Sequence, residues 1–373
     1  MAGLLRWRER PINGMPHGYS LAAGRWVPWV DRALGLLEAP LANATLRGMP
    51  DRPVFLIGAF RSGTTLVERI LCRHPDVASF CYFSNQFVRA PILAAWGIRM
   101  LARIGVLDLQ PQGFIHNPKL PSNLFSSFEC EWIYSQCGRS LWDASDSIEM
   151  GAQFSHPAFE RHLASLVRRH VWLFGKRRFV NKNPYNSLRV GFLGRVFPTA
   201  RFVRVVRHPL ATIASHLHTQ RTLEDALTQV PDGRRIYRDG LHMDVLSAPA
   251  KTAHHAELLE LEALDRSLAL AAQWRDFQDA IDNVLELNPS LRTRVHEIRY
   301  EDLMADPRRS INDLLQQTEL DASGTNVVDA SVASIQPELP DPIQLAHRFQ
   351  PNYARLRALV AAPAERLGYI LPE

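Results

Sequence analysis

Short apolar runs and segments of helical periodicity alternate along most of the chain. Residues 54–57 and 200–206 are largely apolar, which is typical of strands that are buried on both faces of a sheet. Apolar residues at helical spacing predict helices over residues 66–71, 90–109, 256–288, 307–315 and 353–367. Strands that alternate with helices predict an α/β fold, in which helices flank a central parallel sheet.

The order of these elements indicates one large domain. Residues 51–373 are predicted to form a single α/β domain. Residues 1–50, which proline and glycine interrupt, are predicted to be an N-terminal extension that packs on the core. Residues 76–175 contain several helical patterns and proline-rich loops between the first strand and the later ones, so we interpret them as an insertion.

The first apolar run leads into a loop bounded by Gly58 and Gly63, and a helical pattern follows from Thr64 onward. A strand, a tight loop and a helix N-terminus in this order direct free backbone N–H groups and the positive end of the helix dipole at one point. The guanidinium group of Arg61 adds a fixed positive charge inside the loop. A plain glycine turn is the alternative, but the polar residues together favour a site for phosphate or sulfate.

The glycine spacing is that of a P-loop, but two residues that a nucleoside triphosphatase requires are missing. Thr64 stands where a P-loop has its lysine, and the second apolar run ends in Arg207 rather than in an aspartate that could hold Mg²⁺. The loop therefore predicts an anion that is bound without a metal ion, and no metal site is expected. A P-loop kinase or nucleoside triphosphatase is the first alternative.

The segment Gly58-Ala-Phe-Arg-Ser-Gly-Thr-Thr-Leu66 resembles the 5′-phosphosulfate loop of sulfotransferases that use 3′-phosphoadenosine 5′-phosphosulfate (PAPS). Its form is similar to the bacterial, tyrosylprotein and Golgi-type branches of that family. Residues 179–185, 202–215 and 298–307 resemble three further family motifs, in the family's order. The resemblance covers roughly residues 53–320. It implies the sulfotransferase fold and an enzyme that transfers a sulfuryl group from PAPS to a hydroxyl or amine group of an acceptor.

The resemblance also implies which residues bind PAPS. It assigns the 5′-phosphosulfate to the loop residues Arg61, Ser62, Gly63, Thr64 and Thr65. It assigns the 3′-phosphate to Arg207 and to Ser215, although His208 stands where many relatives have aspartate. Tyr300 either approaches the nucleotide, as its counterpart does in relatives, or packs in the core.

Sulfuryl transfer requires charge stabilisation at the oxygen that links sulfur to the 5′-phosphate, and a base for the acceptor proton. The resemblance implies that Lys182 contacts the sulfuryl group or this bridging oxygen; an exposed lysine in a turn is the alternative. Candidates for the general base are Glu129 and Glu131, which otherwise are surface charges on a helix. The tyrosylprotein enzymes carry a glutamate soon after a His-Pro-Asp-Val segment, but none follows Val77 here, which disfavours a tyrosylprotein substrate.

Composition agrees with this interpretation. The formal net charge of +5 suits an enzyme whose co-substrate and product are polyanions. The chain shows no basic helix, zinc-ligand spacing or RNA-binding aromatic motif, so a nucleic-acid partner is not expected. Four cysteines without a Cys-x-x-Cys pair are typical of reduced thiols. No signal peptide and no apolar stretch of membrane-spanning length is visible, so we expect a cytoplasmic enzyme without a transmembrane segment.

The sequence leaves the acceptor open among small molecules, lipids and carbohydrates. Loops at the carboxyl ends of parallel strands line the ligand crevice, so residues 76–175 are the candidate for acceptor recognition. Aromatic residues in this insertion indicate an apolar or amphiphilic acceptor, or else they form core. The second alternative is a non-catalytic protein that binds the nucleotide without turnover. The oligomeric state is not predicted.

Overall fold

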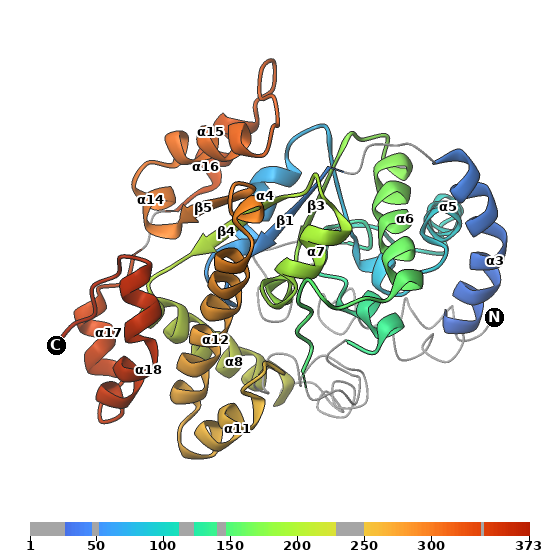
Figure 1. Ribbon diagram of the computed structural model, residues 1–373. Coiled ribbons are helices and arrows are strands. Elements are labelled where there is room, and N and C mark those ends of the chain that lie inside the picture. Colours follow the sequence, from blue (N-terminus) through green and yellow to red (C-terminus); the bar gives the residue numbers. More distant parts are fainter. Residues whose placement is uncertain (1–26, 47–51, 112–122, 140–146, 229–249, 337–338) are drawn as a thin grey trace.

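The computed structural model describes residues 27–46, 52–111, 123–139, 147–228, 250–336 and 339–373. At the centre of these residues lies a parallel sheet of five strands in the order β2-β3-β1-β4-β5 (Figure 1). The strands are β1 (Pro53–Ile57), β2 (Val77–Ser79), β3 (Arg178–Lys182), β4 (Arg201–Val206) and β5 (Val295–Arg299). The predicted α/β fold with a central parallel sheet is confirmed.

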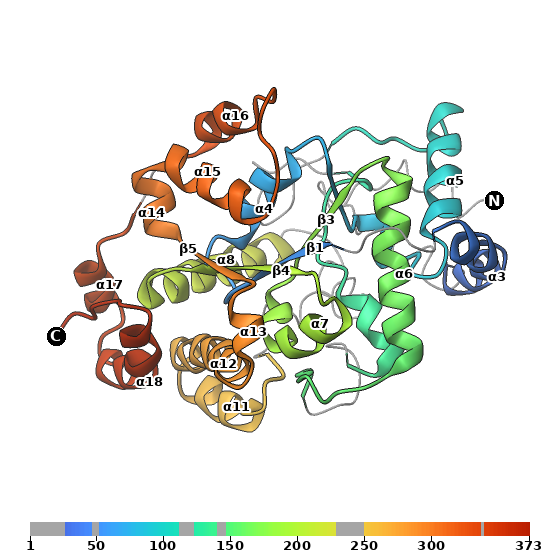
Figure 2. The ribbon, with the colours of Figure 1, turned by 45° about the horizontal axis from the view of Figure 1, so that its top comes forward.

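Helices surround this sheet (Figures 1 and 2). The first part of the chain contributes α3 (Val27–Thr45), α4 (Thr64–Cys72), α5 (Pro91–Arg103), α6 (Pro157–Leu173), α7 (Val190–Val196) and α8 (Pro209–Thr228). It also contributes the short 3₁₀ helices η3 (Tyr82–Asn85), η4 (Glu131–Cys137) and η5 (Pro184–Leu188). The second part contributes α11 (His255–Leu264), α12 (Arg266–Leu287), α13 (Pro289–Arg292), α14 (Tyr300–Ala305), α15 (Pro307–Gln317), α16 (Val327–Ser334), α17 (Pro342–Arg348) and α18 (Tyr353–Arg366).

Helices cover both faces of the sheet. Alternate residues of each strand point to opposite faces, so each strand contributes to two apolar clusters. On one face, Phe55 and Phe202 pack with apolar residues of α6, α7 and α12. On the other face, Val54 and Val203 pack with apolar residues of α4, α15 and α16. Since neither face meets water at these positions, β1 and most of β4 appear in the sequence as apolar runs.

The carboxyl ends of the strands meet at one edge of the sheet, and this edge positions the candidate site. In the ladder, Leu56 of β1 lies beside Lys182 of β3 on one side and beside Val203 of β4 on the other. Beyond this edge the chain continues from β4 into Arg207 and from β5 into Tyr300. Ligands of open α/β sheets bind in the crevice outside such strand ends.

Three elements differ from the sequence prediction. The helical segment predicted over residues 90–109 ends with α5 at Arg103, because Gly105 adopts a left-handed backbone with a φ of +72°. The helix predicted over residues 256–288 is divided into α11 and α12, because Asp265 has an extended backbone and caps α12 by accepting a hydrogen bond from Ser267 N at 2.7 Å. β2 lies within the predicted insertion and forms an edge strand; its three residues are too few to give a periodic pattern. The insertion also contains α5, α6, η3 and η4, while its residues 112–122 and 140–146 lie outside the described ranges.

The described part of the predicted N-terminal extension is α3, which packs against α5 and α6. The buried Asp31 of α3 accepts hydrogen bonds from Arg89 N at 2.9 Å and Ala90 N at 3.1 Å. The buried Glu38 accepts one from Leu93 N at 2.8 Å. These carboxylates satisfy free N–H groups at the start of α5 and complement its dipole. The boundary between extension and domain at residue 50 stays a prediction.

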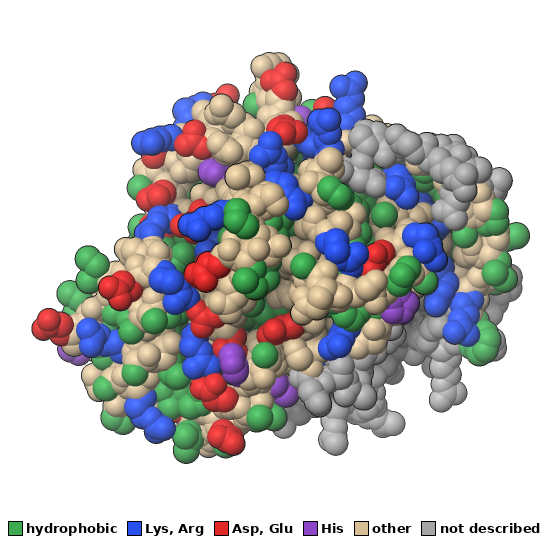
Figure 3. All heavy atoms as spheres, viewed as in Figure 1, with side chains coloured by type: hydrophobic (Ala, Val, Ile, Leu, Met, Phe, Trp, Pro, Cys, Tyr) green, Lys and Arg blue, Asp and Glu red, His purple; other side chains and the backbone are tan. Residues whose placement is uncertain are grey.

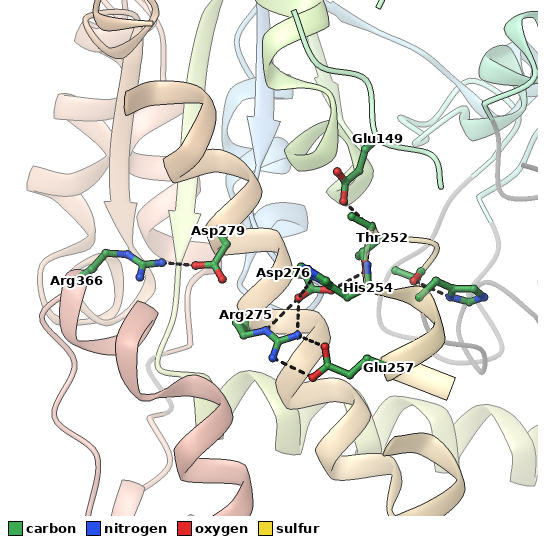
Figure 4. A network of polar contacts seen from close by, with 11 residues as sticks. Glu149, Thr252, His254, Glu257, Arg275, Asp276, Asp279 and Arg366 are labelled. Atoms are coloured by element: carbon green, nitrogen blue, oxygen red, sulfur yellow. Dashed lines mark hydrogen bonds and ion pairs between the residues drawn. The ribbon is translucent and has the colours of Figure 1, made fainter. Parts of the chain in front are cut away.

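A polar network joins α11 and α12 to the segment that precedes them (Figure 4). The buried Asp276 of α12 accepts a hydrogen bond from Thr252 Oγ1 at 2.6 Å and pairs with Arg275 at 2.9 Å. Arg275 also pairs with Glu257 of α11 at 2.8 Å. Farther along α12, Arg366 of α18 pairs with Asp279. The network therefore fixes the described chain from Thr252 onward against α12.

His170 of α6 gives the fold a specific pH dependence. Its buried ring lies 2.6 Å from Ser84 Oγ and 2.8 Å from Leu166 O, and burial lowers the pKa of His170 from 6.5 to about 4. Below about pH 6.5 the unfolded chain takes up a proton that the folded protein does not accept, so stability falls as the pH decreases toward 4. Between pH 7 and pH 5, we expect the unfolding free energy of the wild type to fall by about 2 kcal/mol more than that of His170→Gln. Urea denaturation at the two pH values tests this, and an equal fall in both proteins would contradict it.

Candidate active site

The loop between β1 and α4 requires glycine at both of its ends. Gly58 has a φ of +141° and Gly63 a φ of +103°, values that residues with side chains disfavour. A Cβ atom on Gly58 would lie 2.3 Å from the carbonyl oxygen of Val205 in β4, and one on Gly63 would lie 2.5 Å from the ring of Tyr300. The loop therefore approaches β4 and Tyr300 more closely than a side chain would allow.

Gly58→Ala is expected to disrupt this loop. The added methyl group would have to displace the backbone of β4 while the residue keeps a strained φ, so we expect a loss of about 3 kcal/mol of unfolding free energy. Gly97→Ala is the matched control, because nothing lies within 4 Å of a Cβ at this position in α5. Alanine in a helix is favoured over glycine by about 1 kcal/mol, so the control should be at least as stable as the wild type. Denaturant unfolding of both variants checks the difference.

The first turn of α4 presents hydrogen-bond donors at the loop. Gly63 precedes the helix in the left-handed conformation, and no side chain caps the helix at this position. The N–H groups of Thr64 and Thr65 lie too early in the helix to have an intrahelical acceptor. Among the described residues, the hydroxyl of the buried Ser62 has no hydrogen-bond partner. Unused donors at a helix N-terminus fit an anion.

Two arginines meet at this loop without a carboxylate between them. Arg207 Nη1 donates to the carbonyl oxygen of Arg61 at 3.2 Å. Neither residue forms an ion pair within the described part of the chain, and Arg207 Nε is a buried donor without a partner there. Although part of Arg61 is exposed, protein atoms surround its guanidinium, and this burial and the positive charge of Arg207 lower the pKa of Arg61. Two positive charges held together without a counter-charge form a site for a polyanion.

The candidates for PAPS binding come from four segments that converge on this arginine pair. Besides the loop, they are the end of β4, the second turn of α8 and the start of α14. Ser215 of α8 faces the loop, since its Oγ accepts a hydrogen bond from Arg61 Nε at 3.3 Å. The ring of Tyr300 lies against Gly63 and 4.3 Å from the guanidinium of Arg207. The structure therefore brings all eight candidates together; their role in binding stays a prediction.

Lys182 lies at the carboxyl end of β3 and is buried. Its ammonium group forms an ion pair with Glu129. Burial alone would lower the pKa of Lys182, but the nearby carboxylates of Glu129 and Glu68 outweigh this effect and raise it. The positive charge of Arg61 lowers the pKa of Lys182. Lys182 therefore lies within electrostatic range of the loop. Lys182 is thus a charged, buried lysine rather than an exposed residue of a turn.

The two glutamates proposed as general base occupy different environments. Cys130 between them has a φ of +54°, an unfavourable backbone conformation that lets the two side chains diverge. Glu131 is buried and forms a bidentate ion pair with Arg189, with distances of 2.6 and 2.8 Å. Glu131 also accepts a hydrogen bond from Asn183 Nδ2 at 2.7 Å. Glu129 instead faces Lys182 and keeps 27% of its side chain exposed, which favours Glu129 as the residue that an acceptor can reach.

Glu68 of α4 is a part of this site that the sequence did not reveal. Its side chain is buried, and its Oε1 atom has no hydrogen-bond partner among the described residues. Burial raises the pKa of Glu68 to about 7; the positive charge of Lys182 opposes this rise and the charge of Glu129 adds to it. Only one sign in the sequence indicates that Glu68 could be buried. Glu68 directly follows Val67, an apolar residue of the predicted helix that is itself buried. Its proximity to Lys182 arises only because α4 packs against β3.

The described residues contain no group of three or more histidine, cysteine, aspartate or glutamate side chains that could hold a metal ion. In the same part of the chain, no helix is long and apolar enough to cross a membrane.

Residues 53–324 match a family model described as the sulfotransferase family. The omega-hydroxy-beta-dihydromenaquinone-9 sulfotransferase Stf3 of Mycobacterium tuberculosis is 24% identical over 287 residues, which cover 72% of this chain and 63% of that protein. The nodulation protein NoeE of Sinorhizobium fredii is 27% identical over 161 residues, which cover 43% of this chain and 30% of that protein. The chain thus spans less than two thirds of the length of these curated relatives.

Two solved structures share the fold. The sulfotransferase STF9 of Mycobacterium avium superposes with a TM-score of 0.56 at 13% identity, over 90% of this chain and 81% of that chain. The sulfotransferase STF1 of Mycobacterium tuberculosis superposes with a TM-score of 0.52 at 15% identity, over 96% of this chain and 90% of that chain. At these identities the likeness concerns the fold alone.

Proposed function

The chain belongs to the sulfotransferase family, and we propose that it transfers a sulfuryl group from PAPS to a hydroxyl or amine group of an acceptor. The observation that carries this proposal is the meeting of Arg61 and Arg207 at the glycine loop without a carboxylate partner. PAPS carries a phosphosulfate at one end of its ribose and a phosphate at the other. A site with two unpaired guanidinium groups matches such a polyanion.

The donors of the loop fit the 5′-phosphosulfate. In this proposal the N–H groups of Gly63, Thr64 and Thr65 and the hydroxyl of Ser62 donate to its oxygens. Arg61 supplies the charge at the same end. The buried, unpartnered hydroxyl of Ser62 supports this assignment, because a buried donor without an acceptor is costly unless a ligand satisfies it.

The second arginine fits the 3′-phosphate. Arg207 has a free buried donor at Nε, and Ser215 reaches the same junction from α8. Tyr300 packs beside both the loop and Arg207, where its ring supports the guanidinium and lines the nucleotide site. In this arrangement Tyr300 has both of the roles that the sequence left open.

Lys182 and Glu129 are assigned to the chemical step. The bond between sulfur and the bridging oxygen breaks, a bond from sulfur to the acceptor atom forms, and the acceptor proton passes to the Glu129 carboxylate. Lys182 stabilises the negative charge that grows on the bridging oxygen. The ion pair between these two side chains at the end of β3 supports giving them adjacent roles in this step. Glu131 is assigned a structural role, since Arg189 and Asn183 already use both of its oxygens.

The acceptor class that we propose is a small apolar or amphiphilic molecule, such as a hydroxylated lipid. Phe128, the residue before Glu129, is partly buried and stacks on Tyr82 with ring centroids 4.4 Å apart, so aromatic surface borders the proposed base. A relative that acts on a hydroxylated menaquinone supports the same class. We place the reaction in the cytoplasm, since the four cysteines, all among the described residues, form no disulfide.

Calorimetric titration with 3′-phosphoadenosine 5′-phosphate (PAP), beside ATP with Mg²⁺, tests the proposal. We expect tight binding of PAP that needs no metal ion. Arg61→Ala and Arg207→Ala should each weaken it by about ten- to a hundredfold, because each removes a charged hydrogen-bond donor. Arg308→Ala is the matched control, since Arg308 is exposed and pairs with Asp329 away from the loop. The control should bind PAP like the wild type.

A preference for Mg-ATP would overturn the proposal in favour of a P-loop kinase or nucleoside triphosphatase. That outcome is not expected, because Thr64 and Arg207 replace the lysine and the aspartate that such enzymes need. PAP binding without turnover of PAPS with any hydroxylated acceptor would favour the non-catalytic alternative.

A further inference from the structure

The helix α3 has its polarity inverted relative to an ordinary surface helix. Its acidic residues Asp31 and Glu38 are buried, while Leu36 is 80% exposed and Leu37 is 64% exposed. The bulky Trp29 is exposed as well. A helix at the surface of a protein normally turns its charged residues to water and its apolar residues to the core. An apolar face of this kind indicates a binding surface.

The inversion has a local cause on the buried side. Asp31 and Glu38 cap the start of α5, and Glu38 also pairs with the buried Arg169 at 3.3 Å. Gly35 lies between them along α3, and a Cβ there would meet the side chain of Arg89 at 2.7 Å. The acidic charges of α3 are thus used inside the protein, so its exposed side keeps only the basic Arg32.

The neighbouring helix α5 continues this surface. Trp96, Met100 and Ile104 are exposed at helical spacing, so they form one stripe. Arg103 is exposed beside them, and α5 contains no acidic residue. Trp172 of α6 is also exposed, with its ring 6.4 Å from that of Trp96. Figure 1 places α3, α5 and α6 side by side, and hydrophobic and basic side chains lie at the corresponding edge of Figure 3.

We propose that this α3–α5 surface, formed by Trp29, Leu36, Leu37, Trp96, Met100 and Ile104 with Arg32 and Arg103, docks on a bilayer that contains anionic lipids. Apolar and tryptophan side chains enter the boundary between headgroups and acyl chains, and arginines beside them bind lipid phosphates. The charge pattern selects this occupant. A second copy of the chain would bring the same arginines together, whereas an anionic bilayer complements them.

The apolar cluster beneath α5 extends to the residue before the proposed base. Arg99 of α5 lies 5.1 Å from the ring of Phe125, and Phe125 lies 5.1 Å from Phe83. Phe125 and Phe128 belong to the same apolar cluster as the inner face of α5, and Phe128 is followed directly by Glu129. A docked enzyme would therefore draw an amphiphilic acceptor from the bilayer past these rings. This last step rests on the proposed function; the docking itself does not.

Co-sedimentation with vesicles tests the docking. One set of vesicles contains phosphatidylcholine alone and the other a mixture of phosphatidylcholine and phosphatidylglycerol. We expect the wild type to bind the mixed vesicles and to bind the neutral ones much more weakly. Arg32→Gln/Arg103→Gln should bind the mixed vesicles about 30-fold more weakly, since each basic residue near an anionic surface contributes about fivefold. Arg308→Gln/Arg309→Gln, which removes two exposed arginines of α15, is the matched control.

A second pair of variants tests the apolar contact. Leu36→Glu/Met100→Glu should weaken binding to mixed vesicles by at least about tenfold, because two apolar anchors are replaced by charges that the lipids repel. Leu287→Glu at the end of α12 is the matched control, because Leu287 is 82% exposed and lies outside the surface. An unchanged circular dichroism spectrum and urea midpoint show that each variant is folded.

Equal binding of the wild type to both kinds of vesicle, or equal binding of the wild type and Leu36→Glu/Met100→Glu, would overturn the proposal. A wild-type dimer that Leu36→Glu/Met100→Glu converts to a monomer, with no vesicle binding by either, would overturn it in favour of a protein interface. Failure of the proposed function would give a different result. If the protein docks on mixed vesicles but binds no PAP, the docking proposal stands and the proposal of sulfuryl transfer from PAPS fails.

Discussion

Lys182→Met is expected to lower kcat by about 10²- to 10³-fold while PAP binding stays within about threefold of the wild type. In the proposed mechanism the ammonium group acts on charge that exists only in the transition state, so its loss should affect turnover far more than binding. Methionine keeps the apolar length of the lysine stem, which limits the change in packing at the end of β3. Turnover is measured as release of PAP from PAPS in the presence of a long-chain alcohol or a hydroxylated quinone.

The control for this prediction is Lys176→Met, which removes a lysine outside the site. Lys176 is half-buried and donates to the carbonyl oxygen of Pro75 at 2.5 Å, at the opposite end of β3. Its replacement should leave kcat within about twofold of the wild type, as is usual for sites remote from the chemistry. Near-wild-type turnover of Lys182→Met would remove Lys182 from the mechanism. A parallel loss of PAP binding would make it a binding residue instead.

Glu129→Gln is expected to lower kcat by about a hundredfold or more, because the amide has the same shape but cannot accept the acceptor proton. PAP binding should be nearly unchanged, since Glu129 pairs with Lys182 and with neither arginine of the loop.

Glu68→Gln is the matched comparison for this change. Glu68 also faces Lys182, but it is buried, so it cannot reach an acceptor. The same replacement there should leave most of kcat and instead shift the pH profile near 7, where Glu68 titrates. If Glu68→Gln abolished turnover and Glu129→Gln did not, the roles of the two carboxylates would have to be exchanged.

Much of the fold could be predicted because its strongest signals are local. The strand from Val54 to Ile57 is apolar at every position because both of its faces are covered. The edge strand β2 could not be predicted, since three residues carry no period. The division between α11 and α12 depends on Asp265, whose capping role is visible only when the backbone geometry is known.

The loop of the candidate site could also be predicted from the sequence, while the two glutamates could not be told apart. Glu129 and Glu131 are two residues apart in the same segment and carry the same charge. Their environments differ because Cys130 adopts a left-handed conformation and because Arg189, from a distant segment, pairs with only one of them. Neither the backbone conformation of Cys130 nor the pairing with Arg189 can be recognised from the residues next to the two glutamates in the sequence.

By itself, the sequence determined the α/β class, the order of the main elements and the anion-binding loop. Each of these features depends on residues that are close together in the sequence, no farther apart than about one strand and the helix after it. Such residues lie next to one another whatever the rest of the chain does. Only the tertiary structure decided that Glu68, Glu129 and Lys182 share one site and that α3 turns its acidic residues inward. These features join segments that are far apart in the chain, and packing rather than local periodicity sets which side chains meet.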